Sequence, residues 1–106
     1  MFFVNALMQE LKVTLSKLLK YTNENKLFQV SQNGSELNLV FVPNFPEAEA
    51  HSRGEPVRII MKGKVKEDKV VFEKIYVDEG TSYYEKDMEE AVHAYSAWLE
   101  FIEENY

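Results

Sequence analysis

The sequence predicts a single α+β domain: a four-stranded antiparallel sheet, made of two hairpins, with helices at both ends of the chain, in the order α-β-β-β-β-α. Apolar residues recur with helical spacing near both termini. Two pairs of β-prone runs lie between them, each pair joined by a short turn. With 106 residues, 45% of them hydrophobic, the chain can build one core but not two. The domain is therefore expected to span residues 1–106.

The first helix is predicted over residues 3–21. Apolar side chains recur there every three or four residues, and the polar side chains fall on the other side of the helix. The apolar positions are Val4, Leu7, Met8, Leu11, Leu15, Leu18 and Leu19. The polar run at residues 21–25 competes for backbone hydrogen bonds, so the helix is expected to end there.

A first hairpin is predicted from residues 27–32 and 35–42. The two runs are separated by Asn33-Gly34, which suits the positive φ angles of a type I′ turn. A two-residue loop at this dipeptide would pair Val30 with Leu37 and Phe28 with Leu39 on one face of the sheet.

Residues 43–56 form the one long predicted loop, since they hold all three prolines. Pro46 could begin a single helical turn that ends near Ser52. A second hairpin follows, from residues 57–65 and 70–77. Its two-residue turn would set Val65 opposite Val70, Gly63 opposite Phe72 and Lys62 opposite Glu73.

The last helix is predicted from about residue 85 to residue 105. Its apolar stripe consists of Met88, Val92, Tyr95, Leu99 and Ile102. Both helices are expected on the same face of the sheet.

That arrangement leaves more apolar surface than the helices can cover. If Leu37, Leu39, Phe41, Ile59 and Met61 face the helices, the alternation sends a second apolar set to the opposite face: Val40, Val42, Ile60, Val71, Ile75 and Val77. On the last helix, Trp98 and Phe101 widen the apolar stripe beside Glu100 and Glu104. Large exposed apolar patches mark interaction sites. We therefore expect a protein partner and a homodimer, with contacts from Val40, Ile60, Ile75, Val77, Trp98, Phe101, Glu100 and Glu104.

The charges are unevenly distributed along the chain, whose net charge is −6. Residues 57–77 carry six basic against three acidic side chains, whereas residues 78–106 carry nine acidic side chains against Lys86 alone. The acidic last helix could face solvent or dock a basic partner. Direct nucleic-acid binding is not expected, because a net negative chain repels phosphate.

The compartment is predicted to be the cytoplasm. The chain has no cysteine, which disfavours a small secreted domain held by disulfides. The N-terminal residues lack the features of a signal peptide. No apolar run reaches the ~20 residues of a membrane span.

Catalytic and metal-binding patterns are weak. Glu89 and His93 share a helical face, but a second ligand pair is missing. Neither a nucleophile elbow nor a glycine-rich phosphate loop is present in the sequence. We therefore expect no catalytic residues, no metal and no cofactor.

These observations favour a non-catalytic, acidic protein-binding module, such as an inhibitor, an immunity-type protein, a chaperone or an adaptor. It would act through a sheet face or its acidic C-terminal helix. The alternative is a small-ligand-binding protein or minor enzyme with a pocket between the sheet and the 43–56 loop. The polar contacts of that pocket would be His51, Arg53, Tyr83 and Tyr84.

Overall fold

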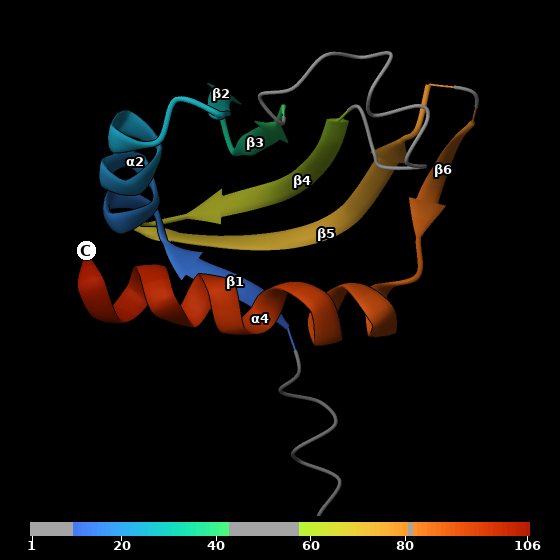
Figure 1. Ribbon diagram of the computed structural model, residues 1–106. Helices are drawn as coiled ribbons and strands as arrows, with labels where there is room; N and C mark the ends of the chain where they lie inside the picture. Colours follow the sequence, from blue (N-terminus) through green and yellow to red (C-terminus); the bar gives the residue numbers. More distant parts are fainter. Residues whose placement is uncertain (1–9, 43–57, 81) are drawn as a thin grey trace, which may run out of the picture.

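The computed structural model describes residues 10–42, 58–80 and 82–106. Its elements are β1 (Leu11–Thr14), α2 (Leu15–Glu24), β2 (Phe28–Asn33), β3 (Glu36–Phe41), β4 (Arg58–Lys66), β5 (Lys69–Asp78), β6 (Tyr83–Lys86) and α4 (Met88–Asn105). The α+β class with an antiparallel sheet and two helices is confirmed (Figure 1). The predicted turn at Pro46–Ser52 lies outside the described residues.

In the described part of the chain, the sheet has six strands in place of the four predicted. Its order is β1-β5-β4-β3-β2, and all pairings are antiparallel. The strand β6 pairs with residues 75–78 of β5, whereas β1 pairs with residues 69–72. The two additional strands are thus short segments that share one long neighbour.

The strand β1 corrects the predicted first helix. Residues 11–14 are extended, with Leu11 and Val13 buried and Lys12 exposed between them, which is the two-residue period of a strand. The spacing of Leu11, Leu15 and Leu18 also fits a helix, so the sequence pattern did not distinguish a strand from a helix at residues 11–14. The helix α2 begins at Leu15, and residues 3–9 of the prediction lie outside the described residues.

The last helix ends at Asn105 as predicted but begins three residues late. Asp87 is its N-cap, and its side chain accepts hydrogen bonds from the backbone N–H groups of Glu89 and Glu90. An aspartate N-cap fixes a helix start by satisfying free donors. The preceding residues are therefore available for β6.

The first hairpin has its predicted strands in a different register. The loop residues are Gly34 and Ser35, so Val30 pairs with Leu39 and Phe28 with Phe41. The predicted pairs of Val30 with Leu37 and Phe28 with Leu39 are wrong by two residues. A shift of two preserves the face of every side chain, so the predicted apolar face holds.

The second hairpin confirms two predicted pairs and corrects a third. Val65 pairs with Val70, and Gly63 pairs with Phe72. A register shift follows at Lys62, which faces Lys74 and not Glu73. This β-bulge adds one residue to β5 and reverses the face of all that follow it.

One core lies between the sheet and both helices. Its largest fully buried side chains are Leu11, Leu18, Leu37, Leu39, Ile75, Ile102, Val13 and Val70. The helix α4 packs over β1 and β5, and α2 contacts α4, β1 and β2. The opposite side of the sheet, called the open face below, carries the alternate residues of each strand.

Candidate functional site

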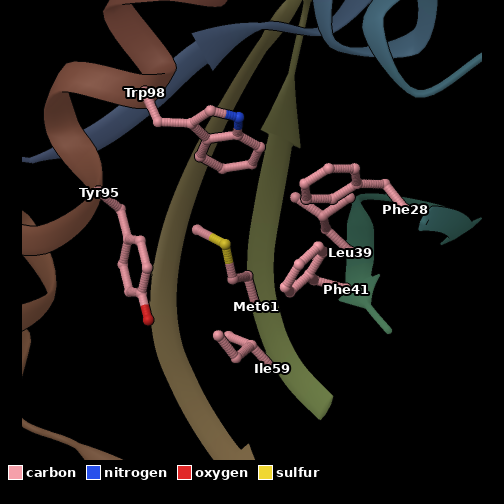
Figure 2. Close-up of a pocket in the computed structure, with 7 residues that line it drawn as sticks. All are labelled: Phe28, Leu39, Phe41, Ile59, Met61, Tyr95 and Trp98. Carbon is pink, nitrogen blue, oxygen red and sulfur yellow. The ribbon is translucent and has the colours of Figure 1, made fainter. Parts of the chain in front are cut away.

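A cavity of about 200 Å³ lies where α4 leaves part of the sheet uncovered, above β2, β3 and β4 (Figure 2). Its lining residues are Phe28, Leu39, Phe41, Ile59, Met61, Tyr95 and Trp98. We call this cavity the aromatic pocket. The strands supply its floor and one side, and α4 supplies Tyr95 and Trp98.

The alternation of the strands explains why these side chains gather. Leu39, Phe41, Ile59 and Met61 all lie on the helix-covered face, since Leu39 pairs with Met61 and Phe41 with Ile59. Phe28 joins them by pairing with Phe41. The pocket is therefore a direct product of the β2-β3-β4 register.

Ring contacts hold the aromatic wall in place. The rings of Phe28 and Trp98 are stacked, with centroids 5.3 Å apart and planes 18° apart, and the centroid of the Phe41 ring lies 4.8 Å from that of Phe28. The indole nitrogen of Trp98 donates to the hydroxyl of Tyr21 at 3.1 Å. Because Tyr21 satisfies this nitrogen, the indole presents carbon atoms to the cavity.

The polar side-chain atoms of the described lining are the indole nitrogen of Trp98, which is bonded to Tyr21, and the hydroxyl of Tyr95. In Figure 2 this hydroxyl points away from Trp98, toward the end of the pocket marked by Ile59. Burial raises the pKa of Tyr95, and the nearby Tyr84 raises it further. Tyr95 is thus a neutral phenol at physiological pH, able to donate a hydrogen bond.

The size and polarity of the pocket define what it can hold. An enclosed apolar cavity of about 150 Å³ stays dry and takes benzene; the aromatic pocket is partly open to solvent. The aromatic pocket is somewhat larger, so an aromatic ring or a short alkyl chain fits. Water gains little there, because it needs two to four polar partners.

Within its described residues, the structure does not bring the four predicted ligand-binding side chains together. His51 and Arg53 lie outside them. Tyr83 and Tyr84 are neighbours on β6 with opposite orientations: Tyr83 stacks on Tyr76 of the open face, at 5.6 Å and 6°, whereas Tyr84 pairs with Val77. Tyr84 is still close enough to Tyr95 to raise its pKa. Of the two, Tyr84 is therefore the one nearer the aromatic pocket.

The predicted partner-binding face needs a correction. Ile75 and Val77 lie in the core, with 0% and 5% of their surface exposed, because the bulge turned them toward the helices. Val40 and Ile60 do lie on the open face, where they pair with each other, and both are half-buried. The apolar surplus of that face is smaller than predicted.

The predicted contacts on α4 divide in the same way. Trp98 lines the aromatic pocket, whereas Phe101 is 49% exposed. Glu100 and Glu104 are exposed as well. The outer side of α4 is therefore mainly acidic, with one exposed aromatic ring.

The open face is basic and aromatic. The ammonium group of Lys62 lies 5.9 Å from the centre of the Tyr76 ring. Lys64 pairs with Glu36, and Arg58 with Asp78. On the open face, the apolar pair of Val40 and Ile60 is thus separated from the strand ends by this cation–π contact and these two ion pairs.

Glu89 and His93 line a broad polar hollow of about 600 Å³ beside α4. Within the described part of the chain, no three His, Asp or Glu side chains converge as a metal ion requires. Neither of the two described helices combines the length and apolar character needed to cross a bilayer.

The fold and pocket define an α+β protein with an apolar cavity between sheet and helix. Comparison with protein families, characterised proteins and solved structures finds no match to this chain. The function is therefore inferred from the residues and geometry of this chain alone.

The sequence pattern predicted that most of the pocket residues belong to the core, so it did not indicate the pocket. Leu39, Phe41, Ile59 and Met61 were correctly expected to face the helices. The signal that could have shown a cavity was the surplus of large rings at Phe28, Phe41, Tyr95 and Trp98. The same rings could equally have closed a solid core, so this signal alone does not distinguish a cavity from a filled core.

Proposed function

We propose that this protein is a non-catalytic binding protein whose site is the aromatic pocket and whose ligand is a small apolar molecule. The carrying observation is the pocket itself: about 200 Å³, lined by four aromatic rings and three aliphatic or thioether side chains. Ligand sites are concave, mostly apolar and equipped with few polar groups. The hydroxyl of Tyr95 is such a group.

The lining supports binding more than chemistry. Among its described residues, Tyr95 has the one titratable side chain, and its raised pKa makes it a poor base at neutral pH. A ligand of ~10 heavy atoms at ~0.6 kcal/mol per atom would gain about 6 kcal/mol. This corresponds to a dissociation constant of tens of micromolar, on the order of 40 µM.

The protein-binding role favoured by the sequence is the second candidate. It is supported by Tyr83, 57% exposed and stacked on Tyr76, and by the basic side chains around them. The apolar surface available for a protein partner is smaller than predicted, since Ile75 and Val77 belong to the core. We therefore favour ligand binding over protein binding as the function.

Trp98 provides the test, because it is the one tryptophan of the chain and lines the pocket. Its emission should shift saturably when octanol, octylamine or octanoate is added. The three share one chain and differ in head group, so a response to all three reports the alkyl chain. A response that rises linearly without saturation would argue against a defined site.

Two neighbouring residues supply matched variants. Ile59→Phe adds volume inside the pocket, whereas Ile60→Phe adds the same volume on the open face. We expect Ile59→Phe to weaken octanol binding roughly tenfold, or ~1.4 kcal/mol, because the added ring atoms occupy space that the ligand needs. Ile60→Phe should bind like the unmodified protein. Equal binding by both variants would place the ligand elsewhere.

A further inference from the structure

Among the described residues, the outer edge of β2 lacks the protection that is usual for an edge strand. β2 is the last strand in the sheet order, and within residues 10–42, 58–80 and 82–106 no strand pairs with its outer side. The other edge strands carry charges: Lys12 in β1, and Glu85 and Lys86 in β6. The β2 sequence, FQVSQN, has neither a charge nor a proline. Proteins commonly use both to block edge pairing.

The hydrogen-bond pattern identifies which backbone groups face outward. The N–H of Val42 donates to the carbonyl of Leu27 at 2.8 Å, so these two form a hydrogen-bonded pair. Such pairs alternate along an antiparallel ladder. The backbone groups of Phe28, Val30 and Gln32 therefore point away from β3. The N–H of Phe28 is occupied by the carbonyl of Asn25 at 3.1 Å.

We propose that this edge pairs with the same edge of a second copy, in an antiparallel dimer with a two-fold axis at Val30. In that register Val30 faces Val30 of the second copy, and Phe28 faces Gln32 of the second copy. Facing residues then lie on the same side of both sheets, as a continuous sheet requires. The free backbone groups supply four hydrogen bonds between the copies: two at the Val30 pair and one at each flanking pair.

The charge distribution favours a second copy over a charged partner. A neutral strand meets its own copy without like-charge contacts, even though each chain carries −6. The backbone of the acidic helix α4 packs mainly over β1 and β5, and α4 contacts β2 through the apolar ring of Trp98. Leu27, 39% exposed, precedes β2 on the edge strand and offers apolar surface beside the edge. The two-fold contact is therefore isologous and closes as a dimer.

Two measurements on the full chain test the pairing. Light scattering from micromolar to submillimolar concentration should show the mass rising toward twice 12.4 kDa. Over the same range, the amide hydrogens of Val30 and Gln32 should exchange with solvent more slowly as dimer forms. The amides of Gln29 and Ser31, bonded within the hairpin, should exchange independently of concentration.

A pair of double variants tests the register. Gln29 and Ser31 are exposed, and in the proposed dimer Gln29 faces Ser31 of the second copy. Q29K/S31K would place lysine opposite lysine twice and should weaken dimerisation roughly tenfold. Q29K/S31E would place lysine opposite glutamate twice and should restore it. Far-UV circular dichroism checks that both variants fold.

Several results would overturn the proposal. One is a protein that stays monomeric at submillimolar concentration. If the Val30 and Gln32 amides of that monomer are protected at every concentration, another segment of the chain occupies the edge. Another is equal dimerisation by the two double variants, which would place the contact on another surface. These readouts are independent of the Trp98 emission, so the dimer and the ligand site can fail separately.

Discussion

At the scale of single residues, Glu103 joins the last helix to the start of α2. One oxygen of its carboxylate accepts the backbone N–H of Thr14 at 2.9 Å, and the other accepts the Thr14 hydroxyl at 2.7 Å. Lys17 forms an ion pair with the same carboxylate at 3.5 Å. The hydrogen bonds from Thr14, followed by the charge of Lys17, hold the pKa of Glu103 below its ordinary value of 4.5. Glu103 thus caps α2 from a distant part of the chain.

We predict that Glu103→Gln lowers the free energy of unfolding at pH 7 by up to about 1 kcal/mol, a cap-sized effect reduced by partial exposure. A carboxylate with a lowered folded-state pKa contributes stability above its unfolded pKa and loses it as the pH falls through the folded value. In urea unfolding, the difference should therefore be smaller at a pH well below 4.5 than at pH 7. Glu104→Gln, on an exposed neighbour, should change little at either pH. A Glu103→Gln deficit that persists at low pH would contradict the electrostatic explanation.

At the scale of elements, Gly63 controls how β4 and β5 pair. A Cβ at this position would lie 2.7 Å from the carbonyl oxygen of Val71 and 3.1 Å from the ring of Phe72. The first contact is with backbone and cannot relax by a side-chain rotation. The glycine therefore allows Phe72 to cross β4 directly before the bulge.

We predict that Gly63→Ala destabilises the protein by about 2–3 kcal/mol, near the top of the range for overpacking. Gly34→Ala provides the comparison, because its Cβ would meet no atom within 4 Å and its φ of +64° alone is strained, at about 1 kcal/mol. Urea unfolding of both variants measures the difference. If Gly34→Ala were the more damaging of the two, the close approach at Gly63 would not be the controlling contact.

The elements also show how far sequence reasoning reaches. Both hairpins, the end of the last helix and the glycine beneath Phe72 were predictable, because turn residues and periodicity act locally. The faces of Ile75 and Val77 were not, since one extra residue at the Glu73 bulge inverts a strand without leaving a distinctive local pattern. Likewise, Leu11 and Val13 become a strand because β5 offers a partner, and that partner is distant in sequence.

At the scale of the whole molecule, the chain places its acidic and basic side chains on different surfaces. Acidic side chains gather on the outside of α4, and basic ones on the open face. The aromatic pocket lies between these regions, and Phe28 places β2 in both the pocket lining and the proposed dimer edge. The pocket was not predictable from composition, because the same rings could equally have closed a solid core.

The most direct test of the ligand site uses the methyl groups of the methionines. Met61 lines the aromatic pocket, whereas Met88 packs against the core at the start of α4 and is not among the pocket residues. Proton–carbon NMR spectra recorded during an octanol titration should show the Met61 methyl signal moving saturably, together with the indole signals of Trp98, while the Met88 methyl stays in place. A titration that moves Met88 as much as Met61, or leaves Met61 unchanged at saturating octanol, would contradict the proposed site.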